Sequence, residues 1–298
     1  MMSRTVVVIG GGYGGSALAK ALDSEADVVL IDPRDAFINS AGSLRALTQP
    51  DWAHNMFFPY GQWLRRGTVV RDRAVSVDPG GVTLASGRRV DADYLVLATG
   101  SSYAYPAKPT SDATDKVLDD LRRTHKELAG AERVLILGAG QAATFTATTT
   151  GGEEITADIW FRAHGVRVNS DYLADDRLTT RTPQGQVPVT ETLNVHGYDH
   201  VYAIGDITDV AETKMAGYAM QHAEVVAQNI IAQLRGEQPT ATYEPLPHPM
   251  ILLPLGPRGG VGQLPTPDGP AVVPVETVSA YKGADLFTGR FTEQFGAA

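Results

Sequence analysis

The chain has 298 residues, of which 43% are hydrophobic, 20% are charged and none is cysteine. This composition is typical of a globular protein with one large core or two modest ones, and it excludes extended disorder. Without cysteine there is no disulfide, thiolate metal site, cysteine nucleophile or redox-active dithiol, and the formal net charge of −9 argues against nucleic acid as a partner.

Nothing in the sequence directs export or predicts a membrane-spanning segment. No apolar run approaches the roughly 18 residues that a transmembrane helix needs. The apolar run near the N-terminus is followed by glycines and is too short for a signal peptide. We therefore expect a cytoplasmic protein, and peripheral contact with a membrane stays open.

The most specific pattern lies in the first 23 residues. Residues 5–9 are a β-branched apolar run that predicts a strand, and residues 16–23 are typical of a helix. Between them stands Gly10-Gly11-Gly12-Tyr13-Gly14-Gly15, which reads G-x-G-x-x-G. In dinucleotide-binding folds the first glycine makes a tight turn, the second lets the backbone approach a pyrophosphate, and the last packs the helix on the strand. The helix N-terminus then faces the anion.

A second predicted strand completes this unit. Residues 27–31 are apolar and end in Asp32, twenty residues beyond Gly12. A carboxylate at this place accepts hydrogen bonds from both hydroxyls of a nucleotide ribose. The unit predicts dinucleotide binding, but it does not by itself distinguish NAD from FAD.

Two later segments decide between these cofactors. Residues 93–97 predict a buried strand that runs into Ala98-Thr99-Gly100, and residues 201–204 predict another that runs into Gly205-Asp206 before a long helix. This combination resembles the two-dinucleotide flavoprotein superfamily. The resemblance implies FAD, with the Ala-Thr-Gly turn near its pyrophosphate and Asp206 at its ribityl and phosphate groups. Without it, Asp206 could be a helix N-cap.

A closer resemblance is carried by four segments. It is to the branch of this superfamily that contains apoptosis-inducing-factor-like proteins, ferroptosis suppressor proteins and type II NADH dehydrogenases. It implies an α/β fold of the glutathione-reductase type, descent from an NAD(P)H:quinone reductase, and small molecules as electron donor and acceptor, with a quinone as the acceptor expected. The segments are residues 37–46, 165–172, 214–223 and 259–263.

The same resemblance assigns further residues to FAD. It implies that Arg45 contacts the flavin, that the backbone of Val75 meets the adenine, and that a helix opening near Lys214 points its N-terminus at the flavin. Gln221 and His222, farther along that helix, either face a quinone or pack on the sheet, and packing is favoured. The residues assigned to FAD are Gly10, Gly12, Gly14, Gly15, Asp32, Pro33, Arg34, Arg45, Val75, Ala98, Thr99, Gly100, Gly205, Asp206, Lys214, Met215 and Ala216.

Other kinds of site find no support in the sequence. His196 and His200 are spaced like half of a zinc site, but no third ligand accompanies them, so no metal is expected. No catalytic acid, base or nucleophile can be assigned.

The sequence departs from the family after residue 137. Residues 133–137 predict a strand, and Gly138-Ala-Gly-Gln-Ala-Ala143 imitates a second glycine turn. Relatives continue there with a helix and about 80 residues of βαβ structure. This chain has a β-branched run at 144–150, a Gly151-Gly152 turn and a strand at 154–161, which predict a hairpin. We infer a deletion, natural or engineered, of most of the NAD(P)H-binding module, including its helix N-terminus and ribose-binding residue.

These patterns predict four regions. Residues 1–110 and 191–245 form the two parts of an FAD-binding domain, and residues 111–190 are a connector, helical at 116–128, with the remnant of the NAD(P)H module. Residues 246–298 are a C-terminal cap, with a strand at 271–278 and a helical or turn segment at 282–290. The cap either covers the flavin or forms a packing surface, such as that of a homodimer. The chain is therefore either an FAD-dependent oxidoreductase or a flavin-binding protein without NAD(P)H turnover.

Overall fold

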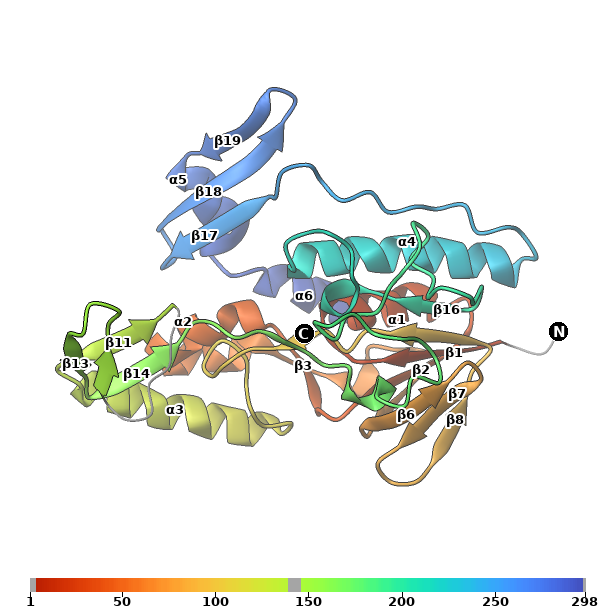
Figure 1. The fold of residues 1–298 in the computed structure, drawn as a ribbon, viewed down its shortest axis with the longest axis horizontal. Coiled ribbons are helices and arrows are strands. Elements are labelled where there is room, and N and C mark those ends of the chain that lie inside the picture. Colours follow the sequence, from red (N-terminus) through yellow and green to blue (C-terminus); the bar gives the residue numbers. More distant parts are fainter. Residues whose placement is uncertain (1–3, 139–145, 297–298) are drawn as a thin grey trace. The chain divides into compact units, whose positions relative to one another are not determined.

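The computed structural model describes residues 4–138 and 146–296 (Figure 1). The chain forms two compact units, whose limits differ from those of the four predicted regions. The first unit comprises Met1–Phe37, Phe58–Ser101 and Val168–Ala298, and the second comprises Ile38–Phe57 and Ser102–Arg167. Among the described residues, no helix is long and apolar enough to span a membrane.

A five-stranded parallel sheet is the centre of the first unit. Its middle strand is fully buried, with Val6, Val7 and Val8 at 0% exposure. A strand covered on both faces needs such a continuous apolar run, which explains the pattern of residues 5–9. In spatial order the strands are β16 (Val201–Ala203), β9 (Tyr94–Leu97), β1 (Thr5–Ile9), β2 (Asp27–Asp32) and β5 (Thr68–Arg71).

Two helices cover one face of this sheet and a small antiparallel sheet covers the other (Figure 1). The helices are α1 (Tyr13–Leu22) and α4 (Ala216–Leu234), and they also pack against each other. The antiparallel sheet consists of β6 (Ala74–Asp78), β7 (Gly81–Leu84) and β8 (Arg89–Asp91). Because β1, β2, β9 and β16 are parallel, their carboxyl ends lie at the same edge of the sheet.

The C-terminal residues form a second antiparallel sheet, with strands β17 (Ile251–Leu255), β18 (Gly259–Thr266) and β19 (Gly269–Val273). The predicted strand at 271–278 is wrong beyond Val273. Pro274 has no N–H to continue the ladder, and the chain enters the short helix α5 (Val275–Val278) directly after it. The predicted helical or turn segment at 282–290 is confirmed: it spans the end of a π-helical turn (Ser279–Gly283) and the start of α6 (Thr288–Phe295).

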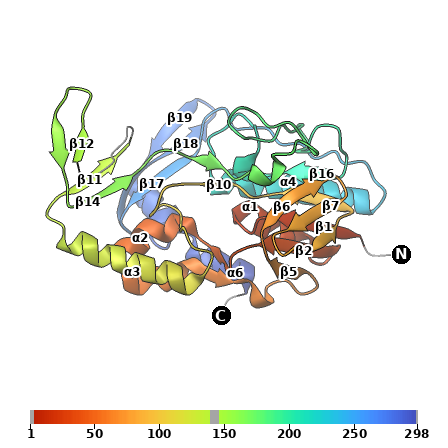
Figure 2. The same cartoon turned by 60° about the horizontal axis from the view of Figure 1, so that its bottom comes forward.

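The second unit contains the predicted connector and hairpin (Figure 2). The helix predicted at 116–128 is confirmed as α3 (Thr114–Gly130), which packs with α2 (Ser43–Thr48) around a small apolar core. The hairpin is confirmed as β12 (Thr146–Thr148) and β13 (Glu154–Thr156). The single strand predicted at 154–161 is wrong, because the chain leaves this ladder after Thr156 and β14 (Ile159–Arg162) pairs instead, in parallel, with β11 (Val134–Leu137). Of the predicted second glycine turn, only Gly138 belongs to the described residues.

The remaining elements are short. They are the strands β3 (Ala36–Ile38), β4 (Phe57–Pro59), β10 (Ser101–Ser102) and β15 (Arg167–Val168), and 3-10 turns at Ser40–Gly42, Pro50–Met56, Tyr60–Gln62, Asp171–Leu173 and Gly205–Ile207.

Candidate functional site

The glycine turn after β1 has little space for side chains. Gly10 has a φ of +106°, and a Cβ there would overlap the carbonyl oxygen of Ala98. A Cβ on Gly15 would overlap the carbonyl oxygen of Gly10. Both positions therefore require glycine: the first for the turn itself, the second for the close contact of α1 with the turn.

The start of α1 is open toward the carboxyl edge of the sheet. Gly12 is the N-cap, no side chain caps the helix, and its first turn contains no acidic residue. A Cβ on Gly12 would meet no atom within 4 Å, whereas a Cβ on Gly14 would lie 2.8 Å from the carbonyl oxygen of Ala219. Gly14 therefore serves the contact between α1 and α4, and Gly12 leaves room for a ligand to approach the helix N-terminus.

Asp32 ends β2 beside this turn, and its side chain is fixed by backbone donors. Its Oδ2 accepts a hydrogen bond from Gly11 N–H at 2.6 Å, and its Oδ1 accepts one from Arg34 N–H at 2.8 Å. A carboxylate oxygen can accept more than one hydrogen bond, so both oxygens can also receive ribose hydroxyls. Pro33 and Arg34 follow directly, as the sequence requires.

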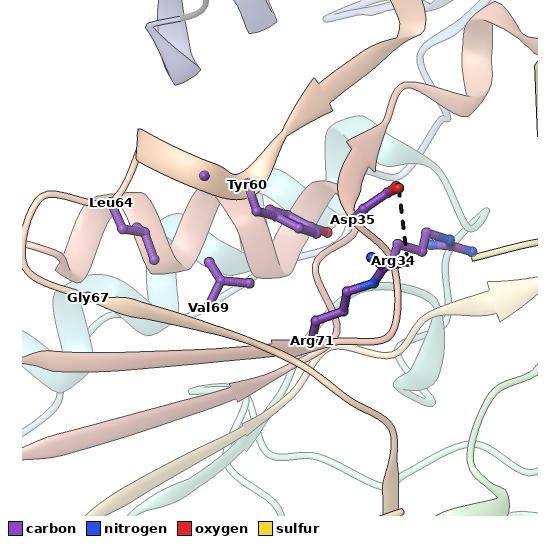
Figure 3. Close-up of a pocket in the computed structure, with 8 residues that line it drawn as sticks. Arg34, Asp35, Tyr60, Leu64, Gly67, Val69 and Arg71 are labelled. Carbon is purple, nitrogen blue, oxygen red and sulfur yellow. Dashed lines mark ion pairs between the residues drawn. The ribbon is translucent and has the colours of Figure 1, made fainter. Parts of the chain in front are cut away.

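A cavity of about 320 Å³ lies beside Arg34 in the first unit (Figure 3). Arg34, Asp35 and Arg71 lie at one end of it, and Leu64 and Val69 line the apolar end. Arg71 Nη2 is 3.9 Å from Asp35 Oδ2. The Nε atom of Arg34 is buried and has no hydrogen-bond partner. A buried donor without a partner is costly, so a ligand that accepts from Arg34 would be stabilised here.

Tyr60, which no sequence motif marks, supports the glycine turn. Its hydroxyl donates to the carbonyl oxygen of Gly11 at 2.7 Å, and its side chain is buried. Burial, and then the charge of Asp32, raise the pKa of Tyr60 well above its usual value, so the hydroxyl stays a donor. The 49 residues between Tyr60 and Gly11 explain why no local pattern reveals this contact.

The Ala98-Thr99-Gly100 turn is held by Asn169. Thr99 Oγ1 donates to the backbone oxygen of Asn169 at 2.6 Å, and Asn169 Nδ2 donates back to the Thr99 oxygen at 3.0 Å. Gly100 has a φ of +62°, which favours glycine. The turn that follows β9 is therefore rigid and lies next to Gly10, where a Cβ would meet Ala98.

Asp206 lies after β16 and is positioned by a neighbouring hydroxyl. Ser101 Oγ donates to Asp206 Oδ2 at 2.5 Å. The alternative that Asp206 is a helix N-cap is wrong, because Ile204 is the N-cap of this 3-10 turn and no side chain caps it. The carboxylate is thus held by Ser101 at the same edge of the sheet as Asp32.

Behind Asp206 lies a buried group of polar side chains. Gly205, with a φ of +73°, donates its N–H to Nδ1 of His222 at 3.0 Å. His222 Nε2 lies 3.0 Å from Glu212 Oε1, and the Tyr243 hydroxyl donates to Glu212 Oε2 at 2.5 Å. Burial, and then the bond to Glu212, raise the pKa of Tyr243. His222 is fully buried, so the predicted packing role of this residue is confirmed.

Helix α4 begins where the sequence predicts. Met215 is its N-cap and Ala216 its first residue, with no side chain capping the helix. Lys214 Nζ donates to the carbonyl oxygen of Val210 at 2.7 Å, and burial lowers the pKa of this lysine. The first turn of α4 packs against the Gly205–Ile207 turn. Its N-terminus is thus beside Gly205-Asp206, just as the N-terminus of α1 is beside the glycine turn.

Two residues assigned to FAD by resemblance belong to elements other than those that form this edge. Arg45 belongs to α2 in the second unit, where its guanidinium lies 5.2 Å from the centre of the Trp52 ring. Val75 belongs to β6 and is 48% exposed. Their contacts with FAD stay predictions. Among the described residues, no three His, Asp or Glu side chains gather as metal ligands would.

This geometry is that of a dinucleotide-binding protein, and the sequence places it in a family. The chain matches the pyridine nucleotide-disulphide oxidoreductase family over residues 4–149 and 141–229, and it belongs to that family. The predicted fold class is confirmed. The chain is an oxidoreductase from a family of flavin-dependent enzymes.

Individual relatives confirm the predicted branch. The chain is 24% identical to apoptosis-inducing factor homolog A of Dictyostelium discoideum, covering 88% of this chain and 85% of the relative. It is 29% identical to ferroptosis suppressor protein 1 of Taeniopygia guttata, covering 88% and 89%. The sulfide:quinone oxidoreductase structure from Aquifex aeolicus superposes with a TM-score of 0.73 at 15% identity, covering 98% of this chain and 90% of that one.

The lengths of these alignments bear on the predicted deletion. The alignment with the Dictyostelium protein has 347 positions, whereas 88% of 298 residues is about 262. About 85 positions of that alignment therefore have no residue of this chain, close to the expected length of the missing βαβ structure. The second family match begins at residue 141, four residues after the end of β11 at Leu137.

Proposed function

We propose that the first unit binds FAD and that the protein passes electrons through this flavin to a small acceptor of the quinone class. The observation that carries the proposal is the edge of the central sheet, where the uncapped N-terminus of α1 and the carboxylate of Asp32 lie on either side of an open Gly12. A nucleotide needs both groups, the helix N-terminus for its pyrophosphate and the carboxylate for its ribose.

The residues present fit FAD. Asp32 would accept the adenosine ribose hydroxyls, and the unpartnered Nε of Arg34 would donate to the adenosine moiety. Asp206, held by Ser101, would accept from the ribityl chain. The α4 N-terminus, with its partial positive charge, would favour negative charge on the flavin ring. When bound, FAD supplies the redox chemistry, and the protein supplies binding, orientation and electrostatics.

The acceptor is proposed from relatives. The Aquifex aeolicus protein is a sulfide:quinone oxidoreductase by name, and it shares the fold over nearly the whole chain. On α4, this chain has Gly217 and Gln221 where the quinone-specific type II dehydrogenases that it resembles have paired glutamines. Gln221 is half-buried, one residue before the fully buried His222. One glutamine of the pair, Gln221, is therefore present, and it supports a quinone as the acceptor.

A second candidate function is favoured by the hairpin after β11. Only residues 138–145 separate β11 from β12, and β12 pairs with β13 instead of leading into a helix. A helix N-terminus and an acidic strand end, which would bind NAD(P)H, have no counterpart in the described part of this segment. The alternative is a flavoprotein that keeps FAD and is reduced by a partner or by light.

Anaerobic absorbance spectra separate these candidates. We expect flavin bands in the purified protein, bleaching by dithionite, and recovery of the bands when a short-chain benzoquinone is added. If excess NADH or NADPH also bleaches the bands, the chain remains a pyridine-nucleotide reductase; if only dithionite does, the second candidate holds. If oxygen reoxidises the reduced flavin but the quinone does not, the result would contradict a quinone acceptor.

A further inference from the structure

A second cavity lies wholly within the second unit, and none of its lining residues is among those assigned to FAD. Its volume is about 470 Å³, which is in the usual range for small-molecule sites. Among the described residues, no acidic side chain lines it, although the chain carries a net charge of −9. Its principal lining side chains are aromatic or cationic: Tyr103, Tyr105, Trp160, Arg162 and Arg167.

The aromatic side of this cavity is anchored from behind. Trp160 and Arg162 are two residues apart on β14, so they point to the same side of the strand. Phe161, between them, packs against the apolar core of the second unit. The Tyr105 hydroxyl donates to Thr124 Oγ1 of α3 at 2.9 Å, whereas Tyr103 is 37% exposed. The cavity therefore has a fixed aromatic wall with one ring open to solvent.

The cationic side has unused binding capacity. Arg162 is exposed, and within residues 4–138 and 146–296 its side chain makes no hydrogen bond or ion pair, while its backbone belongs to the β11–β14 ladder. Lys108 Nζ lies 4.8 Å from the centre of the Tyr103 ring, which adds a positive charge beside the cavity. A guanidinium binds carboxylate or phosphate oxygens with two parallel hydrogen bonds. An anion beside Trp160 would therefore find a donor without competition from an acidic side chain.

We propose that this cavity binds a small planar aromatic anion, with its ring against Trp160 and Tyr103 and its charged group on Arg162. The proposal does not rest on the flavin. Aromatic carboxylic acids and purine nucleoside monophosphates share this chemistry, because both combine a flat ring with an oxyanion. Neither a neutral aromatic compound nor a free inorganic anion offers both contacts.

Isothermal titration calorimetry on the full chain, saturated with FAD, tests the proposal. The probes are 2-naphthoate and adenosine monophosphate, with 2-naphthalenemethanol as the neutral ring and inorganic phosphate as the anion without a ring. We expect at least one of the first two to bind at least 10-fold more tightly than both controls. The tighter of the two identifies the source as an aromatic acid or a nucleotide. No binding by either, or equal binding of a control, would overturn the proposal.

Substitutions at exposed residues locate the binding. Arg162→Gln should lower the affinity for the bound probe by about 10-fold or more, as expected for a lost charge-assisted hydrogen bond. Tyr103→Leu should weaken it by about 5-fold through lost ring contacts. Arg122→Gln, which removes the same charge from the exposed surface of α3, should leave the affinity unchanged. Unchanged affinity in folded Arg162→Gln protein, checked by circular dichroism, would rule out this cavity.

Discussion

In two places the sequence has an apolar strand followed by a glycine-rich segment, and the structures that come after these segments differ. After β1 the turn opens into α1 and then β2, which ends in Asp32. After β11 the chain reaches β12 within nine residues, and a hairpin replaces the helix as the crossover to β14. Both crossovers join parallel neighbouring strands, so the sheet pairing survives while the anion-binding helix does not.

The comparison teaches that glycine spacing alone does not define a nucleotide site. In the first segment, contacts enforce glycine: side chains at Gly10 and Gly15 would overlap backbone oxygens. In the second, a Cβ on Gly138 would meet nothing within 4 Å, and its φ is not in the left-handed region. The function of the first turn depends on what packs against it. Four pairs of substitutions, each with a matched control, test the contacts of these segments.

The largest effect is expected from Asp32→Ala. It removes the acceptor for the ribose hydroxyls and should weaken FAD binding by about 3–5 kcal/mol, since each bond to a charged group contributes about 1.5–3 kcal/mol. Asp158→Ala is the matched control from the second segment, because Asp158 also accepts two backbone N–H groups, at 3.0 and 2.8 Å. FAD titration followed by flavin fluorescence measures both. Equal losses would break the comparison.

The second-largest effect is expected from adding a methyl group at glycines that follow β1 and β11. Gly15→Ala should destabilise the protein by about 2–4 kcal/mol, because α1 must move away from the turn. Gly138→Ala should change the free energy of unfolding by less than about 0.5 kcal/mol, as for an unconstrained surface position. Chemical denaturation of the two variants beside the wild type gives both values. A tolerated Gly15→Ala would mean that α1 does not pack as described.

A smaller and pH-dependent effect is expected at Asp23, which holds the chain just before β5. Its carboxylate accepts hydrogen bonds from the N–H groups of Arg65, Arg66 and Gly67 at 2.6, 3.0 and 2.7 Å. Burial alone would raise the pKa of Asp23, but these three donors lower it below its usual value. The resulting stability is present above the pKa of the unfolded chain and is lost as pH falls through the folded pKa.

Asp23→Ala should therefore cost about 2 kcal/mol at pH 7, and the difference from wild type should shrink below about pH 4. Urea unfolding at several pH values measures it. Asp27→Ala is the control, because Asp27 only pairs with the half-exposed Arg66 at 3.6 Å. A difference that grows on acidification would contradict the role given to Asp23.

The smallest effect concerns the hairpin that replaces the helix. Gly152 has a φ of +84°, whereas the φ of Gly151 is not in the left-handed region. Gly152→Ala should destabilise the protein by about 1 kcal/mol, and Gly151→Ala should have no measurable effect. Thermal unfolding of the pair is the measurement. Identical melting curves would mean that the hairpin turn differs from the one described.

Much of the nucleotide edge was predictable because its signals are local. The turn from Gly10 to Gly15, the strand ending in Asp32 and the start of α4 near Lys214 each follow from neighbouring residues, whose steric requirements are short-range. The deletion after β11 was visible because β-branched residues stand where a helix would begin. The strand predicted at 271–278 extends too far because Val275, Thr277 and Val278 are β-branched, whereas Pro274 ends the strand before them.

The supporting contacts were not predictable, because they join distant parts of the chain. Ser101 and Asp206 are 105 residues apart, and Tyr60 is 49 residues from Gly11. His222 was correctly assigned a packing role, but its bond to Gly205 depends on the packing of α4 against the turn after β16. No periodicity encodes such pairings, since they arise only when the sheet forms.

The central claim is that the first unit holds FAD even though the second segment has lost its nucleotide-binding form. The most direct test is the flavin content of the purified protein after saturation with FAD and removal of excess, measured by absorbance near 450 nm after release of the flavin by acid. The account predicts one FAD per chain. A protein that is folded by circular dichroism yet retains no FAD would contradict it.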